Sequence, residues 1–132
     1  MPTPSNDLQT TTSFELVLPP DPELLRVVRL MASGLASYTD LGFDAVEAVR
    51  VAADELVSTL IQAGNGDDVA VRYAITEGSL VISADATLAD ADGFSLDPLT
   101  DRILDEVASS HSFTIDGGRI SGRIGVDLPA GT

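Results

Sequence analysis

Two side chains that could do chemistry together lie in the segment 44–63, which has the apolar spacing of a helix. Glu55 and Thr59 are four residues apart, so a helix brings both onto one face. That face consists of small and polar residues, separate from the leucine and valine face: Ala48, Ala52, Glu55, Thr59 and Gln62. Burying a glutamate without a metal ion or an arginine is costly, so this face either lines a pocket or lies partly exposed on the helix surface.

A second group of ionisable side chains is the segment 85–97, which holds four aspartates. Compared with the calcium loop of an EF-hand, Asp90 and Asp92 fit the third and fifth positions. Leu88 and Leu99 then stand at the first and twelfth positions, where acidic ligands are required. The sequence therefore predicts a solvated acidic loop and no calcium site.

His111 is the single histidine of the chain, and it follows two serines between a predicted helix and a predicted strand. A catalytic triad needs a nucleophile and an acid beside the histidine, but the chain has no GxSxG elbow and no cysteine. The lack of cysteine also excludes disulfides and cysteine-ligated zinc. We therefore expect a surface-loop histidine and no metal site.

The elements that must position these groups follow from the hydrophobic periodicity. Alternating apolar residues predict strands at 14–18, 69–75, 80–84, 113–115 and 120–126, and a 3.6-residue period predicts helices at 22–38, 44–63 and from 98. The order is β-α-α-β-β-α-β-β, with neighbouring strands antiparallel. This order predicts an α+β two-layer sandwich with the helices on one face of the sheet.

Local signals predict where two of the helices begin. Asp44, with Glu47 three residues on, has the spacing of a capping box. Asp97 followed by Pro98 is typical of a helix start. In the helix from residue 98, the residues expected to face the core are Leu99, Ile103 and Val107.

The charge of the chain limits its partners. Its 132 residues include 21 acidic residues and seven arginines, with no lysine, and the formal net charge is -14. Such a surface repels nucleic acid and anionic membranes, and it suits a basic protein partner. No apolar run could span a bilayer and the N-terminus does not have the pattern of a signal peptide, so we expect a cytoplasmic protein. The length fits one domain at 13–128, with a disordered tail at 1–12 and a short tail at 129–132.

The order of the segments and three local strings resemble the anti-sigma factor branch of the GHKL (Bergerat-fold) ATPases, the serine-protein kinases of the RsbW and SpoIIAB type. The strings are Leu24–Arg29, Phe43–Leu60 and Leu104–Val107. The resemblance covers about residues 13–128 and is greatest to the actinobacterial antagonists of sigma-F-type stress factors. It implies a GHKL-like fold and a protein that binds a sigma factor and an anti-anti-sigma factor, and it raises the prospect of a homodimer.

In this family one helix presents a glutamate that activates or positions the attacking group and, four residues later, an asparagine that binds Mg²⁺. The resemblance puts Glu55 at the position of the glutamate, as the catalytic base, and Thr59 at the position of the asparagine. It puts Asp85 at the position of the aspartate that recognises adenine. Thr59 and Asp85 are therefore expected to belong to the remnant of a nucleotide pocket.

Other nucleotide-binding elements of the family are missing from the sequence. Thr87 and Ala89 replace two glycines after the aspartate, and side chains there restrict the backbone and fill space. The segment 94–99 replaces the lid that holds the phosphates; Asp97 adds negative charge there and Pro98 has no N–H donor. Phosphoryl transfer depends on positioning and charge neutralisation. We therefore expect no cofactor and little or no kinase activity, and the alternative is an active serine-protein kinase that binds ATP and Mg²⁺.

The resemblance also implies partner-binding residues in the first helix. Arg26 matches a family arginine that contacts both the sigma factor and its competitor, and Arg29 lies one turn on. From the residues alone, we would expect solvated arginines whose stems cover the apolar edge of the helix. The predicted function is an anti-sigma factor that sequesters a stress-type sigma factor and is released by an anti-anti-sigma partner. A degenerate GHKL domain that binds an unrelated protein is the second alternative.

Overall fold

The structure, a computed structural model, describes residues 10–90 and 92–129. Its elements are β1 (Thr10–Leu18), the 3-10 turn η1 (Pro22–Leu24), α2 (Leu25–Tyr38), α3 (Phe43–Ala63), β2 (Val69–Thr76), β3 (Ser79–Thr87), α4 (Pro98–Val107), β4 (Ser110–Asp116) and β5 (Arg119–Asp127). The strands form one antiparallel sheet in the order β1-β2-β3-β5-β4. The predicted order of helices and strands is confirmed.

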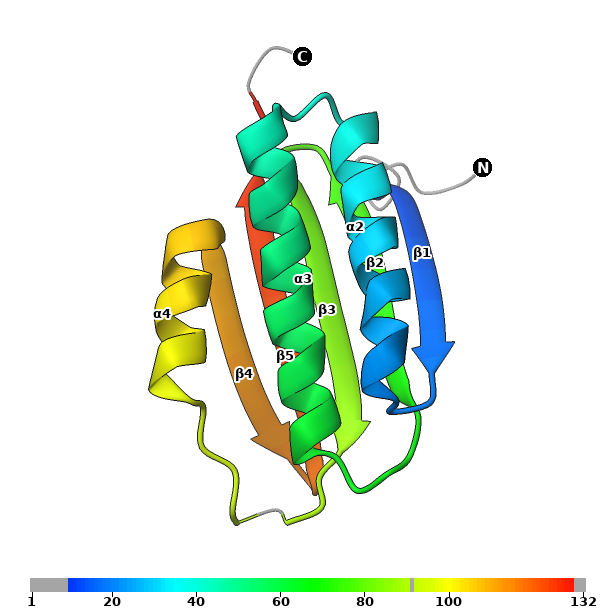
Figure 1. Ribbon diagram of the computed structural model, residues 1–132, viewed down its shortest axis with the longest axis vertical. Coiled ribbons are helices and arrows are strands. Elements are labelled where there is room, and N and C mark those ends of the chain that lie inside the picture. The colour runs from blue at the N-terminus through cyan, green and yellow to red at the C-terminus, as the bar shows by residue number, and fades with distance from the viewer. Residues whose placement is uncertain (1–9, 91, 130–132) are drawn as a thin grey trace, which may run out of the picture.

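The α-helices lie together on one face of the sheet (Figure 1). α3 runs over the middle of the sheet, α2 covers the side of β1 and β2, and α4 lies beside β4. This arrangement confirms the predicted α+β two-layer sandwich. In the described part of the chain, no helix is long and apolar enough to span a membrane.

Strand alternation decides which side chains reach the helices. In β3, the buried residues are Leu80, Ile82, Ala84 and Ala86, and the residues between them lie half-buried on the other face of the sheet. α3 provides the opposite side of the core through Val49, Ala52, Ala53, Leu56, Val57 and Leu60, all fully buried. The core therefore fills the single layer between the sheet and the helices.

A glycine in β5 allows close packing beneath α3. A Cβ atom on Gly122 would lie 2.5 Å from Cδ1 of Leu56 and 2.8 Å from Cε2 of Phe113, closer than Cβ atoms approach other carbon atoms in proteins. Phe113 in turn faces Phe94, with 6.2 Å between the ring centroids. Gly122 thus lets the core extend to the segment before α4.

The hydroxyl of Tyr73 is a polar group inside this core, and it has a partner there. Tyr73 is fully buried, and its hydroxyl donates a hydrogen bond of 3.0 Å to the backbone carbonyl of Val28. Burial raises the pKa of Tyr73 above its ordinary value. The bond joins β2 to α2 and fixes that helix on the sheet.

Two local predictions were wrong. The N-cap of α3 is Gly42, so Asp44 lies in the first helical turn and makes no capping box. Glu47 instead pairs with Arg50 on the same helix. An acidic residue in the first turn still suits the helix dipole.

The predicted core face of α4 was also displaced. Leu99 is 62 % exposed, whereas Leu104, which the prediction left out, is fully buried and Val107 packs against the core as predicted. The predicted start of α4 is confirmed, because the side chain of Asp97 accepts a hydrogen bond from the backbone N–H of Leu99.

The β4–β5 hairpin turns where the sequence predicted it to turn. Gly117 and Gly118 have φ angles of 58° and 82°, the left-handed region that a tight hairpin of this kind requires. At the other end of the chain, β1 includes residues 10–12, which the sequence assigned to a disordered tail. Residues 1–9 of that tail, and residues 130–132, lie outside the described residues.

Candidate functional site

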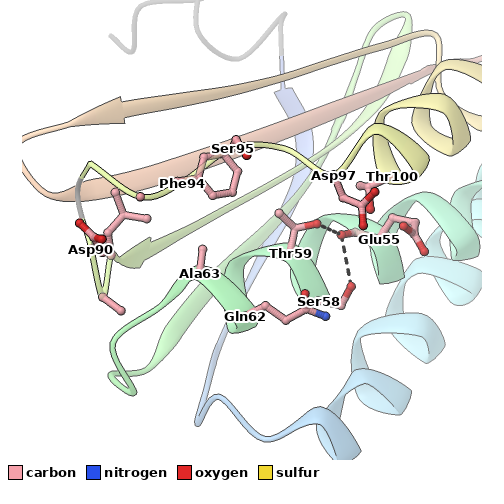
Figure 2. A pocket seen from close by; sticks show the side chains of 13 residues that line it. Glu55, Ser58, Thr59, Gln62, Ala63, Asp90, Phe94, Ser95, Asp97 and Thr100 are labelled. Atoms are coloured by element: carbon pink, nitrogen blue, oxygen red, sulfur yellow. Dashed lines mark hydrogen bonds between the residues drawn. The ribbon is translucent and has the colours of Figure 1, made fainter.

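An open cavity of about 490 Å³ lies between α3 and the segment that leads from β3 to α4. Its lining residues are Glu55, Ser58, Thr59, Gln62, Ala63, Leu88, Ala89, Asp90, Gly93, Phe94, Ser95, Asp97 and Thr100. Figure 2 shows the side chains of α3 forming one wall and the segment before α4 forming the other. The cavity is large enough for a small-molecule ligand or for part of a partner protein.

The α3 wall is built from the small and polar face of the helix. Glu55, Thr59 and Gln62 line the cavity, as the pocket-lining interpretation of that face predicted. Ala52, which the sequence placed on the same face, is fully buried in the core instead. The face therefore changes along the helix, from core at its middle to cavity wall in its last two turns.

Backbone hydrogen bonds fasten the two walls together at the C-terminal end of α3. The N–H of Ala89 donates to the carbonyl of Ala63 at 3.0 Å, and the N–H of Asn65 donates to the carbonyl of Thr87 at 2.9 Å. A Cβ atom on Gly64 would lie 3.0 Å from the carbonyl oxygen of Leu60, so a small residue suits this close crossing. These bonds fix the end of the cavity where β3 leaves the sheet.

The carboxylates of the cavity have no basic neighbours in its lining. The described residues of the lining include Glu55, Asp90 and Asp97 but no arginine or histidine. Among the described residues, the carboxylate of Glu55 has no hydrogen-bonding or ionic partner. Asp97 holds its carboxylate at the N-terminus of α4, the place where a helix otherwise attracts a phosphate. This distribution of charge favours a cation and opposes a triphosphate.

The hydroxyl groups of the α3 wall are partly engaged by the helix itself. The Thr59 hydroxyl donates to the backbone carbonyl of Glu55 at 2.7 Å, and the Ser58 hydroxyl lies 3.4 Å from the same oxygen (Figure 2). The oxygen lone pairs of Thr59 remain directed outward from that bond. Thr59 can therefore accept a hydrogen bond from a ligand, but it does not extend as far as an asparagine side chain.

Asp85 lies away from the cavity. It is paired with Ala70 and Ser121 in the sheet, and its side chain points to the face that has no helix. There its carboxylate is 3.8 Å from a guanidinium nitrogen of Arg119 and 3.5 Å from the hydroxyl of Ser121. The structure therefore brings Glu55 and Thr59 together but does not bring Asp85 to them, because odd-numbered residues of β3 face away from the helices.

The two arginines of the first predicted helix have different surroundings. Arg29 forms an ion pair with Asp54 of α3 at 2.7 Å, so its guanidinium is engaged within the chain. Arg26 is exposed, and among the described residues it has no ionic partner. Of these two arginines, Arg26 can therefore bind a partner without breaking an ion pair of the fold, whereas Arg29 cannot.

Arg26 belongs to an unusual helix surface. We call the exposed side of α2 the outer face of α2; it consists of Arg26, Val27, Leu30, Gly34, Ser37 and Tyr38. Leu30 is 75 % exposed and Tyr38 is 72 % exposed. The sequence prediction named the arginine but not Leu30 or Tyr38, although Leu30 follows Arg26 at the i+4 spacing of one helix face.

His111 lies in a group that the sequence did not predict. Its Nε2 is 2.8 Å from Oδ1 of Asp101, and its Nδ1 is 3.6 Å from Oδ1 of Asp105. Both aspartates lie on α4, four residues apart, and His111 is the second residue of β4. By contrast, Asp90 of the acidic segment closes a local turn by accepting the N–H of Asp92.

Comparison with known proteins gives relatives of one kind. No family model matches the chain. The serine-protein kinase RsbW of Bacillus velezensis is 33 % identical over 89 residues, which are 64 % of this chain and 53 % of that protein. RsbW of Bacillus subtilis is 31 % identical over the same share of each chain, and RsbW of Bacillus pumilus is 30 % identical over 80 residues. The chain thus spans about half the length of the curated relatives it matches.

A solved structure has the same fold. A chain from the crystal structure of the SiaB-SiaC complex of Pseudomonas aeruginosa superposes with a TM-score of 0.63, at 14 % sequence identity, over 93 % of both chains. The finer prediction of a greatest likeness to actinobacterial sigma-F antagonists has no counterpart among these relatives and stays a prediction. The predicted resemblance to RsbW proteins is confirmed as a similarity in sequence, and the predicted two-layer fold is shared with this solved structure.

Proposed function

We propose that this chain is an anti-sigma factor that binds and sequesters a stress-type sigma factor, is released by an anti-anti-sigma partner, and has little or no kinase activity. The observation that carries the proposal is the outer face of α2, where exposed apolar side chains surround Arg26. The sequence similarity to RsbW proteins supports the class of partner.

The composition of the outer face of α2 favours a protein partner. Arginine and tyrosine are enriched among the residues that dominate binding energy at protein interfaces. Arg26 and Tyr38 supply them here. Leu30 lies between them and exposes apolar area, whose burial by a partner would be favourable. The rest of the chain is strongly acidic, so a partner with basic and apolar surface would be attracted and oriented during approach.

Binding of both partners to the outer face of α2 would also explain how the sigma factor is released. If the sigma factor and the anti-anti-sigma factor both need Arg26 and Leu30, the two cannot bind the same copy of α2 together. Displacement then follows from competition and needs no chemical step. A sigma factor held in this way is kept from RNA polymerase, and the chain would act in the cytoplasm. Whether it acts as a homodimer stays a prediction.

The cavity supports the second half of the proposal, that the chain transfers phosphate poorly or not at all. Three carboxylates line it without a basic residue, and Asp85 points to the other face of the sheet. A nucleotide triphosphate brings about four negative charges at neutral pH and needs positive groups or backbone N–H donors around it. We expect no nucleotide cofactor for this reason.

A pull-down from the native cytoplasm tests the proposal. The wild-type chain, an Arg26→Glu variant and an Arg102→Glu variant are used as bait at the same salt concentration, and captured proteins are identified by mass spectrometry. Arg102 is also exposed but lies on α4, so the third bait carries the same charge change at a different place. We expect a sigma factor on the wild type and on Arg102→Glu and none on Arg26→Glu. If no bait captures a sigma factor although all are folded, the proposal is wrong.

An active serine-protein kinase is the alternative, and two observations favour it. Glu55 and Thr59 share one wall of the cavity, and the relatives that match the chain are named serine-protein kinases. Transfer of labelled phosphate from ATP to a purified anti-anti-sigma partner would establish it. A different captured partner, with no sigma factor, would favour the second alternative, a degenerate GHKL domain that binds an unrelated protein.

A further inference from the structure

We propose that His111, Asp101 and Asp105 form a binding site for a divalent transition-metal ion of the Zn²⁺ type. One imidazole nitrogen and two carboxylate oxygens, one atom from each residue, lie within 4.8 Å of one another. The site lies apart from the cavity, since none of the three residues lines it. The inference therefore does not depend on the proposed function.

The fold holds these three ligands close to one another. Asp101 and Asp105 are four residues apart on α4, so both carboxylates project from the same side of the helix. His111 follows only four residues after the helix ends, and β4 holds it against that side. The histidine side chain is only 13 % exposed, so the imidazole has few alternative positions. The aspartates are exposed and can rotate about it.

The distances allow a metal ion with small side-chain movements. Zn²⁺ binds imidazole nitrogen and carboxylate oxygen at roughly 2.0–2.2 Å, which places tetrahedral ligand atoms roughly 3.2–3.6 Å apart. The Nε2 of His111 is 2.8 Å from Asp101, and its Nδ1 is 3.6 Å from Asp105. The two aspartates face different ring nitrogens, so an ion bound to one nitrogen would require the side chain of the other aspartate, which is exposed, to rotate toward it. The ion would replace the present hydrogen bond to Asp101.

The types of ligand atom determine which class of metal ion the site would prefer. An imidazole nitrogen favours zinc, nickel and copper, whereas Mg²⁺ and Ca²⁺ prefer oxygen ligands throughout. This is a mixed nitrogen and oxygen set with three protein ligands, which leaves a fourth position for water. The site therefore has the ligand number of an exchangeable zinc site rather than that of a closed structural one.

The charge of the surroundings also favours a cation. Among the described residues, neither Asp101 nor Asp105 has an arginine partner; their ionisable neighbour is the His111 imidazole. The chain has three times as many acidic residues as arginines, so carboxylates without a cation are the rule. A bound ion would clamp α4 to β4, and the first turn of α4 carries the cavity residues Asp97 and Thr100.

The experiment measures Zn²⁺ binding to the full chain, stripped of metal and purified without a histidine tag. Isothermal titration at pH 7 gives the affinity, and equilibrium dialysis with elemental analysis gives the stoichiometry. The variants are His111→Asn and Asp105→Asn, with Glu106→Gln as the matched control because it removes one exposed carboxylate from the same helix. Mg²⁺ serves as the comparison ion. The resonances of the single histidine ring report binding at the site itself.

We expect one Zn²⁺ per wild-type chain, with shifted imidazole resonances and no comparable binding of Mg²⁺. The dissociation constant should rise by on the order of 100-fold in His111→Asn and by more than tenfold in Asp105→Asn, and it should stay the same in Glu106→Gln. If the wild type binds Zn²⁺ no more tightly than His111→Asn, or if Zn²⁺ leaves the ring resonances unchanged, the group is only a hydrogen-bonded histidine and the proposal is overturned. Asp105→Asn keeps the test valid should His111→Asn fold poorly.

Discussion

The outer face of α2 and the cavity beside α3 are both exposed, but they present opposite chemistry. The helix face combines apolar side chains with Arg26, which has no ionic partner among the described residues. The cavity combines polar side chains with carboxylates, and its described lining residues include no basic one. A nucleotide needs positive charge where this chain has negative charge. A protein partner needs apolar area with a few charged anchors, and the chain offers that on α2.

The core that holds the fold together does not include the polar residues of the cavity, so these residues can differ while the fold stays the same. The core between α3 and the sheet is complete, and the hydroxyl of Tyr73 still joins the sheet to α2. Thr59 and Asp97 line the cavity and neither side chain belongs to that core, although Asp97 also caps α4. The cavity can thus lose its nucleotide chemistry at little cost to the position of α2.

The largest expected effect is on partner binding by the outer face of α2. Leu30→Glu and Arg26→Glu should each weaken binding of the captured sigma factor by at least about 100-fold, because interface anchors of this kind dominate affinity. Fluorescence anisotropy with the purified partner gives the affinities. Both side chains are exposed, so the melting temperature should not change. A full-strength interaction with both variants would show that the partner binds elsewhere.

The next effect concerns alkaline pH and the attachment of α2. Burial raises the pKa of Tyr73 in the folded chain, whereas the unfolded chain releases that proton near its ordinary pKa of about 10. The stability contributed by the protonated hydroxyl is therefore complete below pH 10 and is lost as the pH rises toward the folded value. The free energy of unfolding should fall by at most about 1.4 kcal/mol per pH unit above pH 10.

Urea unfolding at a series of pH values checks this, and the chain suits the measurement because it has no lysine or cysteine to titrate in the same range. The control is Tyr73→Phe, which should remove most of this alkaline dependence. A wild-type chain as stable at pH 11 as at pH 9 would contradict the buried position of the hydroxyl.

At neutral pH, Tyr73→Phe should lower the free energy of unfolding by a smaller amount. It removes the 3.0 Å hydrogen bond to the carbonyl of Val28 and leaves that oxygen without its side-chain partner. We expect a loss of about 1 kcal/mol in the free energy of unfolding. Sigma-factor binding should weaken slightly as α2 becomes less firmly held, whereas the matched variant Tyr38→Phe should leave stability unchanged because Tyr38 is exposed.

The smallest expected effect is that of added nucleotide on the melting temperature. A ligand present at 100 times its dissociation constant would stabilise the fold by about 2.7 kcal/mol, which raises the melting temperature by several degrees. We expect no such rise with millimolar ATP and Mg²⁺, measured against Mg²⁺ alone. A clear rise that disappears in Glu55→Gln would restore the kinase alternative, and the difference between the two regions would then be smaller than we describe.

Most of the fold could be predicted from the sequence because it depends on short-range patterns. The alternation in Val69–Thr76 and Ser79–Thr87 fixed both strands, and Gly117 and Gly118 marked the last hairpin. Helix ends were harder. The N-cap of α3 is Gly42, two residues before the predicted Asp44, although Asp44 has better capping chemistry.

The site was less predictable because it depends on which face a residue takes and on contacts between distant segments. Glu55 and Thr59 were found together because helical spacing alone relates them. Asp85 was expected at the cavity, but the period of two in β3 turns it to the other face of the sheet. The group around His111 was missed because nothing in a strand pattern shows which helix its side chain will meet. The two aspartates at i and i+4 were the one signal that could have been used.

The most direct test of the difference between the two regions is the affinity of the captured sigma factor for this chain, measured with Mg²⁺ alone, with ATP and Mg²⁺, and with ADP and Mg²⁺. We predict the same dissociation constant in all three conditions, because the outer face of α2 binds the partner and the cavity takes no part. Binding that appears only with ATP, or that changes tenfold or more between ATP and ADP, would contradict this and show that the cavity is a working nucleotide site.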